Sequence, residues 1–233
     1  MDSAVSIIGA RLASRTVDLM RLPIFAAAKQ YTAPQSLLLI TTNYELYTAV
    51  YPICLANVIA QIDSEQIRLP LVKNLWEEHG RGNPSRGHRL MMATFVSSVR
   101  RAYELSEIDP ETTISPTTRA AIEELKTVTR EQGPHRGVGA LLALELTNVS
   151  QVNIMRNRLL IDAPKDVDQK YLAEHEELDS GHAAEMGCVA DGLIHNSWDL
   201  EETVAGALTA VGADIIFWQG LSESIDKGGR SGK

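Results

Sequence analysis

The stretch LLLITTNYELYTAVYPICLANVIAQI, residues 37–62, decides the fold class. Large apolar or aromatic side chains recur in it at every third or fourth position: Ile40, Tyr44, Tyr47, Tyr51, Leu55 and Val58. An α-helix turns once in about 3.6 residues, so this spacing forms one continuous stripe along a helix, whereas a strand would alternate with a period of two. The stretch therefore predicts a long helix with a buried face, which Pro52 can kink.

The same spacing continues through the rest of the chain. Further helices are expected between segments rich in Gly and Pro, over residues 68–79, 84–105, 116–131, 138–160, 167–193 and 197–221. No segment alternates apolar and polar residues over a useful length, so no sheet is expected. The sequence predicts an all-α bundle of seven to nine helices.

Length and composition fit one compact helical domain over residues 1–225, followed by a Gly-rich, charged tail, 226–233, that is expected to be disordered. The formal net charge of -8 argues against nucleic acid as a partner, because phosphate binding needs a basic surface. No apolar run approaches the length of a membrane span, and no signal peptide is recognisable. Cys54 and Cys188 give no disulfide framework, so a cytoplasmic protein with reduced thiols is expected.

The stretch YLAEHEELDSGH, residues 171–182, contains a candidate metal-binding pattern. His175, Asp179 and His182 follow an i, i+4, i+7 spacing, so they lie within about 60° of one another around a helix axis. Two imidazoles and a carboxylate on one face are suitable ligands for a first-row metal, with open positions left for oxygen. Taken alone, however, the stretch fits a charged, solvated helix face better.

Glu145 is a single carboxylate in the apolar segment GALLALELTNV. Three of its four neighbours one helical turn away are apolar: Leu141, Leu142 and Val149. A buried carboxylate is costly unless it is paired, protonated or bound to a cation. A place at the polar edge of the helix is the alternative, but the neighbours favour a functional carboxylate.

A third segment, NLWEEHGRGNPSRGH, contains Glu77, Glu78, His79 and His88 around a break between two helices. His79 next to a glycine is more typical of a helix end than of a metal ligand. The Glu-x-x-His pairs of ferritin-like proteins are absent, since Ser85 stands three residues before His88. The three segments together still place carboxylates and imidazoles on three or four helices of one bundle, as helical di-iron sites require.

The order of these motifs resembles the haem-oxygenase-like di-iron oxidases and oxygenases. This family shares a fold of about seven core helices with haem oxygenase, thiaminase II and pyrroloquinoline-quinone synthase, but binds no haem. The resemblance extends over residues 68–220 and rests on NLWEEHGRGN with His88, ALLALE ending at Glu145, YLAEHEELDSGH, and the closing IIFWQGL.

The resemblance implies that two Fe(II) ions are held by six residues: Glu78, His88, Glu145, His175, Asp179 and His182. Some family members carry a Glu where this chain has Ser85, and others carry it about ten residues before the histidine. Glu78 is therefore the first choice to accompany His88, Glu77 is the second, and Glu45 is a weaker candidate.

The implied activity is O2 activation at the two ferrous ions, supported by an external reductant. The expected substrate is an amino acid or an amino-acid-derived metabolite of natural-product biosynthesis. The family's outcomes are N-oxygenation, desaturation, C–N ring closure, C–C cleavage and nitrile formation, and its members are often homodimers. Candidates to line the pocket, although core packing is the commoner role for each, are Tyr44, Tyr47, Tyr51, Trp76 and Phe95. Candidates to bind a substrate carboxylate are Arg68, Arg86, Arg89 and Arg156.

Two other functions remain open at this point. One is a metal-free enzyme of the thiaminase II or pyrroloquinoline-quinone synthase type, for which neither Cys54 nor Cys188 has a nearby base in sequence. The other is a helical interaction domain without catalysis, which would leave Glu145 unexplained inside its apolar helix.

Overall fold

The computed structural model describes residues 3–26, 28–106 and 113–230, and of residues 177–180 and 228–230 it describes the backbone alone. The described part of the chain is helical and has no strand, which confirms the predicted all-α class. Its α-helices are α1 Ala4–Met20, α2 Lys29–Thr32, α3 Pro34–Thr48, α4 Tyr51–Ile59, α5 Glu65–Glu78, α6 His88–Ala102, α8 Pro116–Glu131, α9 Pro134–Ile154, α10 Lys170–Leu193 and α11 Ser197–Arg230.

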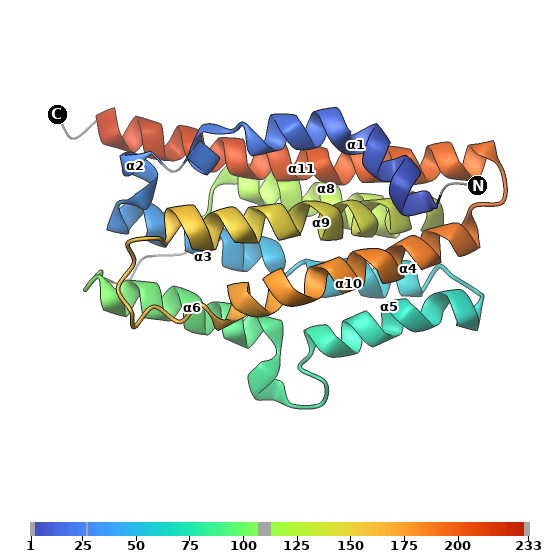
Figure 1. Cartoon of the computed structure of the whole chain (residues 1–233), viewed down its shortest axis with the longest axis horizontal. Coiled ribbons are helices and arrows are strands. Elements are labelled where there is room, and N and C mark those ends of the chain that lie inside the picture. Colours follow the sequence, from blue (N-terminus) through green and yellow to red (C-terminus); the bar gives the residue numbers. More distant parts are fainter. Residues whose placement is uncertain (1–2, 27, 107–112, 231–233) are drawn as a thin grey trace.

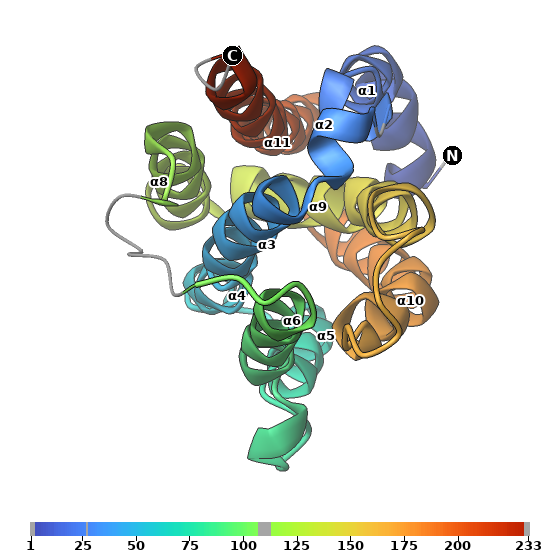
Figure 2. The ribbon, with the colours of Figure 1, turned by 90° about the vertical axis from the view of Figure 1, so that its left-hand side faces the viewer.

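Helix α9 lies at the centre of the bundle. It runs along the long axis of the molecule, with α11 and α1 on one side and α10 on the other (Figure 1). The end-on view shows α8, α11 and α1 on one side of α9, and α5 and α6 on the opposite side (Figure 2). Glu145, on α9, is therefore in the interior of the bundle.

Helices α9 and α11 pack with their backbones in close approach. A Cβ atom added to Gly139 would lie 1.9 Å from the carbonyl oxygen of Thr203, and one added to Gly206 would lie 2.0 Å from the carbonyl oxygen of Arg136. Any larger residue at either position must push the helices apart. These two glycines therefore determine how closely the central pair of helices can pack.

The same two helices, over Pro134–Leu159 and Ser197–Lys227, are long and apolar enough to cross a membrane by length and composition. In each, 61% of the apolar window is buried inside the protein. A core helix of a large bundle is apolar around most of its circumference and passes the same test.

The helix predicted over residues 37–62 is two helices, α3 and α4. Pro52 stands in the first turn of α4, where its missing N–H is tolerated. Its ring would collide with the carbonyl of Thr48, four residues earlier, in a continuous helix. Helix α3 accordingly ends at Thr48.

The helix predicted over 84–105 is also divided: Pro84–Arg86 form a 3-10 turn, and α6 begins at His88. The helix predicted from 138 begins earlier, at Pro134, and ends in a π-helical turn, Met155–Leu159. The predicted start of α8 is confirmed, since the Ser115 side chain accepts a hydrogen bond from the Thr117 N–H.

Residues 226–230, part of the predicted disordered tail, continue α11 in the structure, and 231–233 lie outside the described residues. At the other end of the chain, Ser3 caps α1 through its side chain, which accepts from the Ser6 N–H.

Candidate metal centre

Four helices bring five of the six predicted iron ligands into the interior of the bundle. Each is at most 8% exposed: Glu78 at the end of α5, His88 at the start of α6, Glu145 in α9, and His175 and His182 in α10. Buried carboxylates and imidazoles need partners, so their concentration here points to a functional site.

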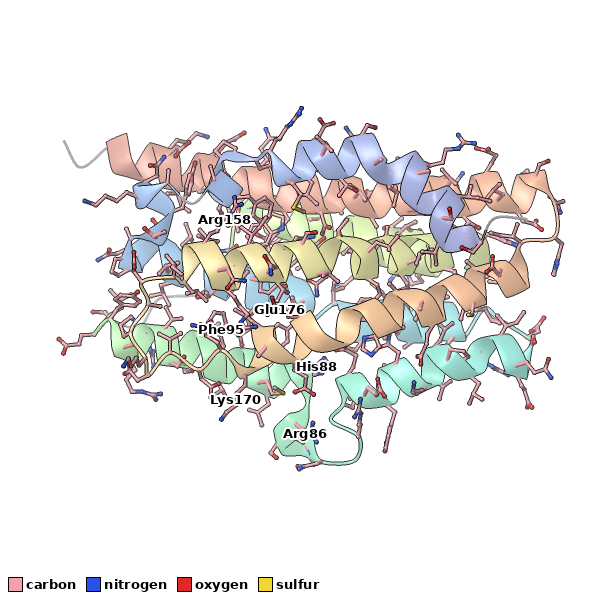
Figure 3. All side chains as sticks on the ribbon, in the orientation of Figure 1. Arg86, His88, Phe95, Arg158, Lys170 and Glu176 are labelled. Carbon is pink, nitrogen blue, oxygen red and sulfur yellow. The ribbon has the colours of Figure 1, made fainter. Side chains whose placement is uncertain are left out.

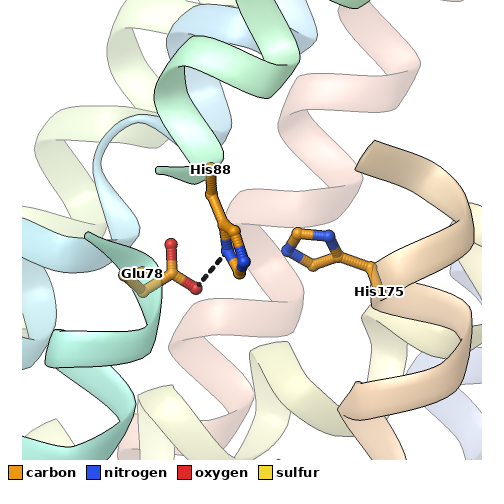
Figure 4. Close-up of side chains that lie close together, drawn as sticks. All are labelled: Glu78, His88 and His175. Atoms are coloured by element: carbon orange, nitrogen blue, oxygen red, sulfur yellow. Dashed lines mark ion pairs between the residues drawn. The ribbon is translucent and has the colours of Figure 1, made fainter. Parts of the chain in front are cut away.

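Glu78, His88 and His175 form the tightest group. Each offers a ligand atom, and these three atoms lie within 4.8 Å of one another. The side chains converge from three different helices (Figure 4), and Nδ1 of His88 is 3.0 Å from Oε1 of Glu78. The two imidazole rings are 4.5 Å apart between centroids. One cation placed among them could contact all three.

The turn between α5 and α6 creates this proximity. Gly80 adopts a φ of +81°, in the left-handed region that favours glycine. A Cβ atom there would lie 2.2 Å from the carbonyl oxygen of Asn83. The turn reverses the chain within a few residues, so that His88 faces Glu78, whereas His79 stays exposed at the end of α5.

The ring orientation of His175 leaves one nitrogen ready for a metal. Its Nδ1 lies 2.9 Å from the backbone carbonyl oxygen of Tyr171, which can only accept, so Nδ1 donates the proton and Nε2 is the free ligand atom. Burial, and then the charge of His88, lower the pKa of His175 to about 4. The imidazole is therefore neutral at pH 7, which is the form that binds metals.

The contact between Glu78 and His88 favours the charged form of each side chain. Burial alone would raise the pKa of Glu78, but the contact with His88 outweighs it and the pKa is lowered. Burial alone would lower the pKa of His88, but the contact with Glu78 outweighs burial and the pKa is raised. Although the two groups are within ion-pair distance, the direction of approach leaves Nδ1 of His88 without a well-aligned hydrogen bond.

Glu145 and His182 form a second group beside the first. Nδ1 of His182 is 3.8 Å from Oε1 of Glu145, and its Nε2 is 2.9 Å from Oε2 of Glu77. Tyr51 donates a short hydrogen bond to Oε1 of Glu145, and Nδ2 of Asn74 donates to the same oxygen over 3.2 Å. Burial raises the pKa of Glu145 to about 7 despite these donors.

The remaining carboxylates predicted from sequence are placed as follows. Glu77 and Glu78 both contact a predicted histidine ligand, so the first and second choices belong to the same site. Glu77 also pairs with Arg81 over 3.0 Å. Glu45 is half-buried in α3, and burial raises its pKa while Arg89 acts in the opposite direction. The side chain of Asp179 lies outside the described residues.

A cavity adjoins both groups. The space in it that the centre of a water molecule can occupy is about 70 Å³. Its lining includes Glu78, Glu145, His175 and His182 together with aromatic and aliphatic side chains. Of the aromatic residues predicted to line a pocket, Tyr44, Tyr47 and Tyr51 do so. Trp76 is instead 55% exposed, and Phe95 is buried in the core.

The four arginines considered for a substrate carboxylate are not among the residues that line this cavity. Arg86 lies on the protruding turn before α6 (Figure 3) and pairs with Glu174 over 3.4 Å. Arg156 lies in the π-helical turn that follows α9 and pairs with Glu176 of α10. Arg89 is exposed and Arg68 is half-buried on α5.

Other residues of the cavity escaped the sequence analysis: Tyr171, Asn148, Gln151 and Asp214. Asp214 could have been recognised as a candidate from the sequence. Its neighbours one turn away are Ala210, Val211, Phe217 and Trp218, all apolar, so the argument that singled out Glu145 applies to it even more strongly.

The donor set fits a metal. Three carboxylates and three imidazoles meet in the interior, and Nδ1 of His88 is buried without a well-aligned hydrogen bond. Arg81 pairs with Glu77, at the edge of the set. Cations bound among the other donors would neutralise the negative charge of the remaining carboxylates. Oxygen and imidazole nitrogen donors of this kind suit iron.

Comparison with known proteins gives one family. A family model described as an iron-containing redox enzyme matches residues 40–214, a range that includes all six predicted ligands. No curated protein matches the chain.

Solved structures match nearly the whole chain. A CADD-like protein of unknown function from Nostoc punctiforme is 16% identical, with a TM-score of 0.68 over 94% of this chain and 98% of that one. A TenA homologue from P. horikoshii is 10% identical, with a TM-score of 0.69 over 95% and 99%. A Shewanella denitrificans domain of unknown function with a heme oxygenase-like fold is 14% identical, with a TM-score of 0.67 over 99% and 94%. At these identities the likeness shows the fold.

Proposed function

The chain belongs to the family of iron-containing redox enzymes, and from this premise we propose that it is a non-haem di-iron oxygenase or oxidase that uses O2. The heme oxygenase-like fold and the iron-containing family confirm the resemblance found in the sequence. The number of irons, the use of O2 and the substrate go beyond that family description and form the proposal.

One observation carries the proposal. Two adjacent groups of buried donors, Glu78 with His88 and His175, and Glu145 with His182, adjoin the same cavity. A single ion among the first group would leave the second group without a cation. Two ions would satisfy both groups, and helical di-iron sites are built from such carboxylates and imidazoles on facing helices.

The chain's own residues have distinct roles in this proposal. Two Fe(II) ions, when bound, would supply electrons for the reduction of O2, and an external reductant would restore them. His88 and His175 would hold one ion with Glu78, while His182 and Glu145 would hold the other. Asp179 keeps its predicted role as a ligand.

Glu145 is oriented by its own partners. Tyr51 and Asn74 both donate to Oε1, which fixes the carboxylate and lowers the cost of its ionised form. The carbon-rich walls of the cavity, including Val50, Leu125 and Leu144, limit the access of water to the reacting centre.

Iron binding is the test. The protein is loaded with Fe(II) without oxygen, freed of excess metal and assayed for iron, and its visible absorbance is then followed on mixing with O2. About two ions per chain and a transient absorbance are expected. His175→Ala should lose iron, whereas His195→Ala should not, because His195 is exposed beyond the end of α10.

Three results would count against the proposal. Absence of bound iron, or equal iron in the wild type and His175→Ala, would remove the metal centre. One ion per chain would replace the di-iron proposal by a single-iron one. Two ions without any reaction with O2 would indicate a storage or structural site.

A thiol-dependent, metal-free enzyme on this fold has less support. Neither cysteine is among the residues that line the cavity. Cys54 is fully buried, and burial raises its pKa to about 11, which disfavours the reactive thiolate. Cys188 is exposed on α10.

A further inference from the structure

A second cluster of polar side chains, which contains no histidine, lines the same cavity. Asp214 of α11 is 1% exposed, and it lines the cavity together with Tyr47 and Gln151. Its Oδ1 accepts from the Tyr47 hydroxyl over 2.7 Å, and its Oδ2 accepts from Nε2 of Gln151 over 2.8 Å. The network joins α3, α9 and α11 around one carboxylate.

The amide orientation in this network is determined by a tryptophan. Nε1 of Trp218, which can only donate, lies 2.6 Å from Oε1 of Gln151. Nε2 of Gln151 must therefore face Asp214 as a donor. The Thr147 hydroxyl is 2.9 Å from Oδ2 of Asp214 and 3.0 Å from the Ala143 carbonyl oxygen, and its single proton can satisfy only one of them.

Within the described part of the chain, no cationic side chain compensates Asp214. The partners of its carboxylate there are hydroxyl and amide groups, and it forms no ion pair with a described Lys, Arg or His. Burial raises its pKa, as expected for a carboxylate without a cation. A buried carboxylate that borders a cavity is strongly stabilised by a ligand that brings a positive charge.

Helix α9 connects the two carboxylates of the cavity. Glu145 lies on α9, and Gln151, six residues later on the same helix, donates to Asp214. Six residues of α-helix advance about 9 Å, and both residues line the cavity. A small molecule held at Asp214 would therefore extend its next atoms toward the centre formed by Glu145 and His182.

The remaining walls indicate what kind of molecule fits. Val50, Leu125 and Leu144 supply aliphatic surface, and the tyrosines supply ring faces, which attract cations. Lys and Arg are absent from the described residues that line the cavity. A carboxylate-bearing ligand would find no Lys or Arg beside Asp214, whereas an ammonium group would find its carboxylate.

Resting on the proposed function, we propose that Asp214 is the recognition site for the ammonium group of the substrate, a small amine with an apolar body. The amine nitrogen contacts Asp214, and the carbon atoms beside it face the metal centre. Among amino-acid-derived metabolites, this favours amines that have lost the carboxylate or present it elsewhere.

The test uses iron-free protein and three four-carbon probes of similar size: n-butylamine, n-butanol and butyrate. Binding is followed through the indole N–H resonances of 15N-labelled protein, which has three tryptophans. Trp218 reports on the Asp214 network, whereas Trp76 and Trp198 are exposed and serve as internal controls. Trp76→Phe and Trp198→Phe assign the peaks.

Butylamine is expected to move the Trp218 resonance and to bind at least ten-fold more tightly than butanol or butyrate. Asp214→Asn should weaken amine binding at least ten-fold. The matched control is Asp226→Asn, which alters a Tyr–Asp pair on the same helix, formed with Tyr31 over 3.0 Å and away from the cavity. It should leave amine binding unchanged.

Equal binding of the three probes to the wild type, or an unmoved Trp218 resonance, would overturn the inference even if Asp214→Asn does not fold. Unchanged amine binding in a folded Asp214→Asn protein would do the same. Tyr47→Phe keeps the carboxylate but removes one of its donors, so it should retain amine binding or tighten it, and a ten-fold loss would count against the role of Asp214.

These results are separable from the proposed function, because iron uptake is measured independently. Iron binding without amine selectivity refutes only the role of Asp214. Amine selectivity without iron refutes the di-iron proposal and leaves Asp214 as an ammonium site.

Discussion

His88 and Glu78 face each other across the turn 79–87, with Nδ1 of the imidazole 3.0 Å from Oε1 of the carboxylate. They come from different helices, and His175 of α10 completes the group (Figure 4). The two side chains are buried and close together, but Nδ1 of His88 has no well-aligned hydrogen bond. A cation that both side chains coordinate would therefore stabilise them better than their contact with each other.

We predict that His88→Ala reduces bound iron from about two ions per chain to about one or fewer. The imidazole supplies a ligand atom of the tightest donor group, and Glu78 then loses its partner. Metal analysis after anaerobic loading measures the loss. Glu65→Gln, an exposed change at the start of the same helix as Glu78, is the control and should keep the full complement.

We predict that Glu145→Gln changes how the stability of iron-free protein depends on pH. The folded-state pKa of Glu145 is raised from 4.5 to about 7. The contribution of Glu145 to the free energy of unfolding is therefore fully present below pH 4.5 and is lost as the pH rises through 7. Gln cannot ionise and escapes this loss. When the pH is raised from 4.5 to 8, the free energy of unfolding of the variant should therefore increase, relative to that of the wild type, by on the order of 3 kcal/mol.

Urea unfolding of both proteins at the two pH values measures this gain. His175 acts in the opposite sense, because its lowered pKa makes stability rise between about pH 4 and pH 6.5. It is present in both proteins and cancels in the comparison. The raised pKa of Glu145 would be contradicted if the two proteins differed in free energy of unfolding by the same amount at both pH values.

Tyr51→Phe should weaken iron binding roughly ten-fold near pH 6.5. The hydroxyl donates to Glu145 and helps to keep its pKa down, so its removal lets protons compete better with the metal. At pH 8.5 the carboxylate is ionised in either protein, and the affinities should converge. A pH-independent loss would instead indicate a displaced ligand.

Gly139→Ala should destabilise the protein by roughly 1–3 kcal/mol, because its Cβ would collide with the backbone of Thr203. Gly212→Ala on α11 is the matched comparison, since nothing lies within 4 Å of its added Cβ. It should stabilise the helix by about 0.5–1 kcal/mol. Thermal unfolding of the two variants distinguishes them, and equal effects would refute the close approach of α9 and α11.

Much of the fold and part of the site could be predicted from local patterns. The spacing of apolar residues revealed the helices, and Ser115 with Pro116 marked the start of α8. Glu145 was found because a carboxylate in an apolar helix needs a partner, and Asp214 could have been found in the same way. The division at Pro52 was missed because a proline can either kink a helix or begin a new one, and packing selects between them.

The sequence by itself determined the helical periodicity, the chemistry of the donor residues and their order along the chain, because these depend on neighbours within a few turns. Tertiary structure decided which donors meet. It placed Glu78 against His88 and Glu77 against His182, and left Glu45 outside. It also placed Asp214 on the cavity and the candidate arginines away from it, since that depends on how helices distant in sequence pack around α9.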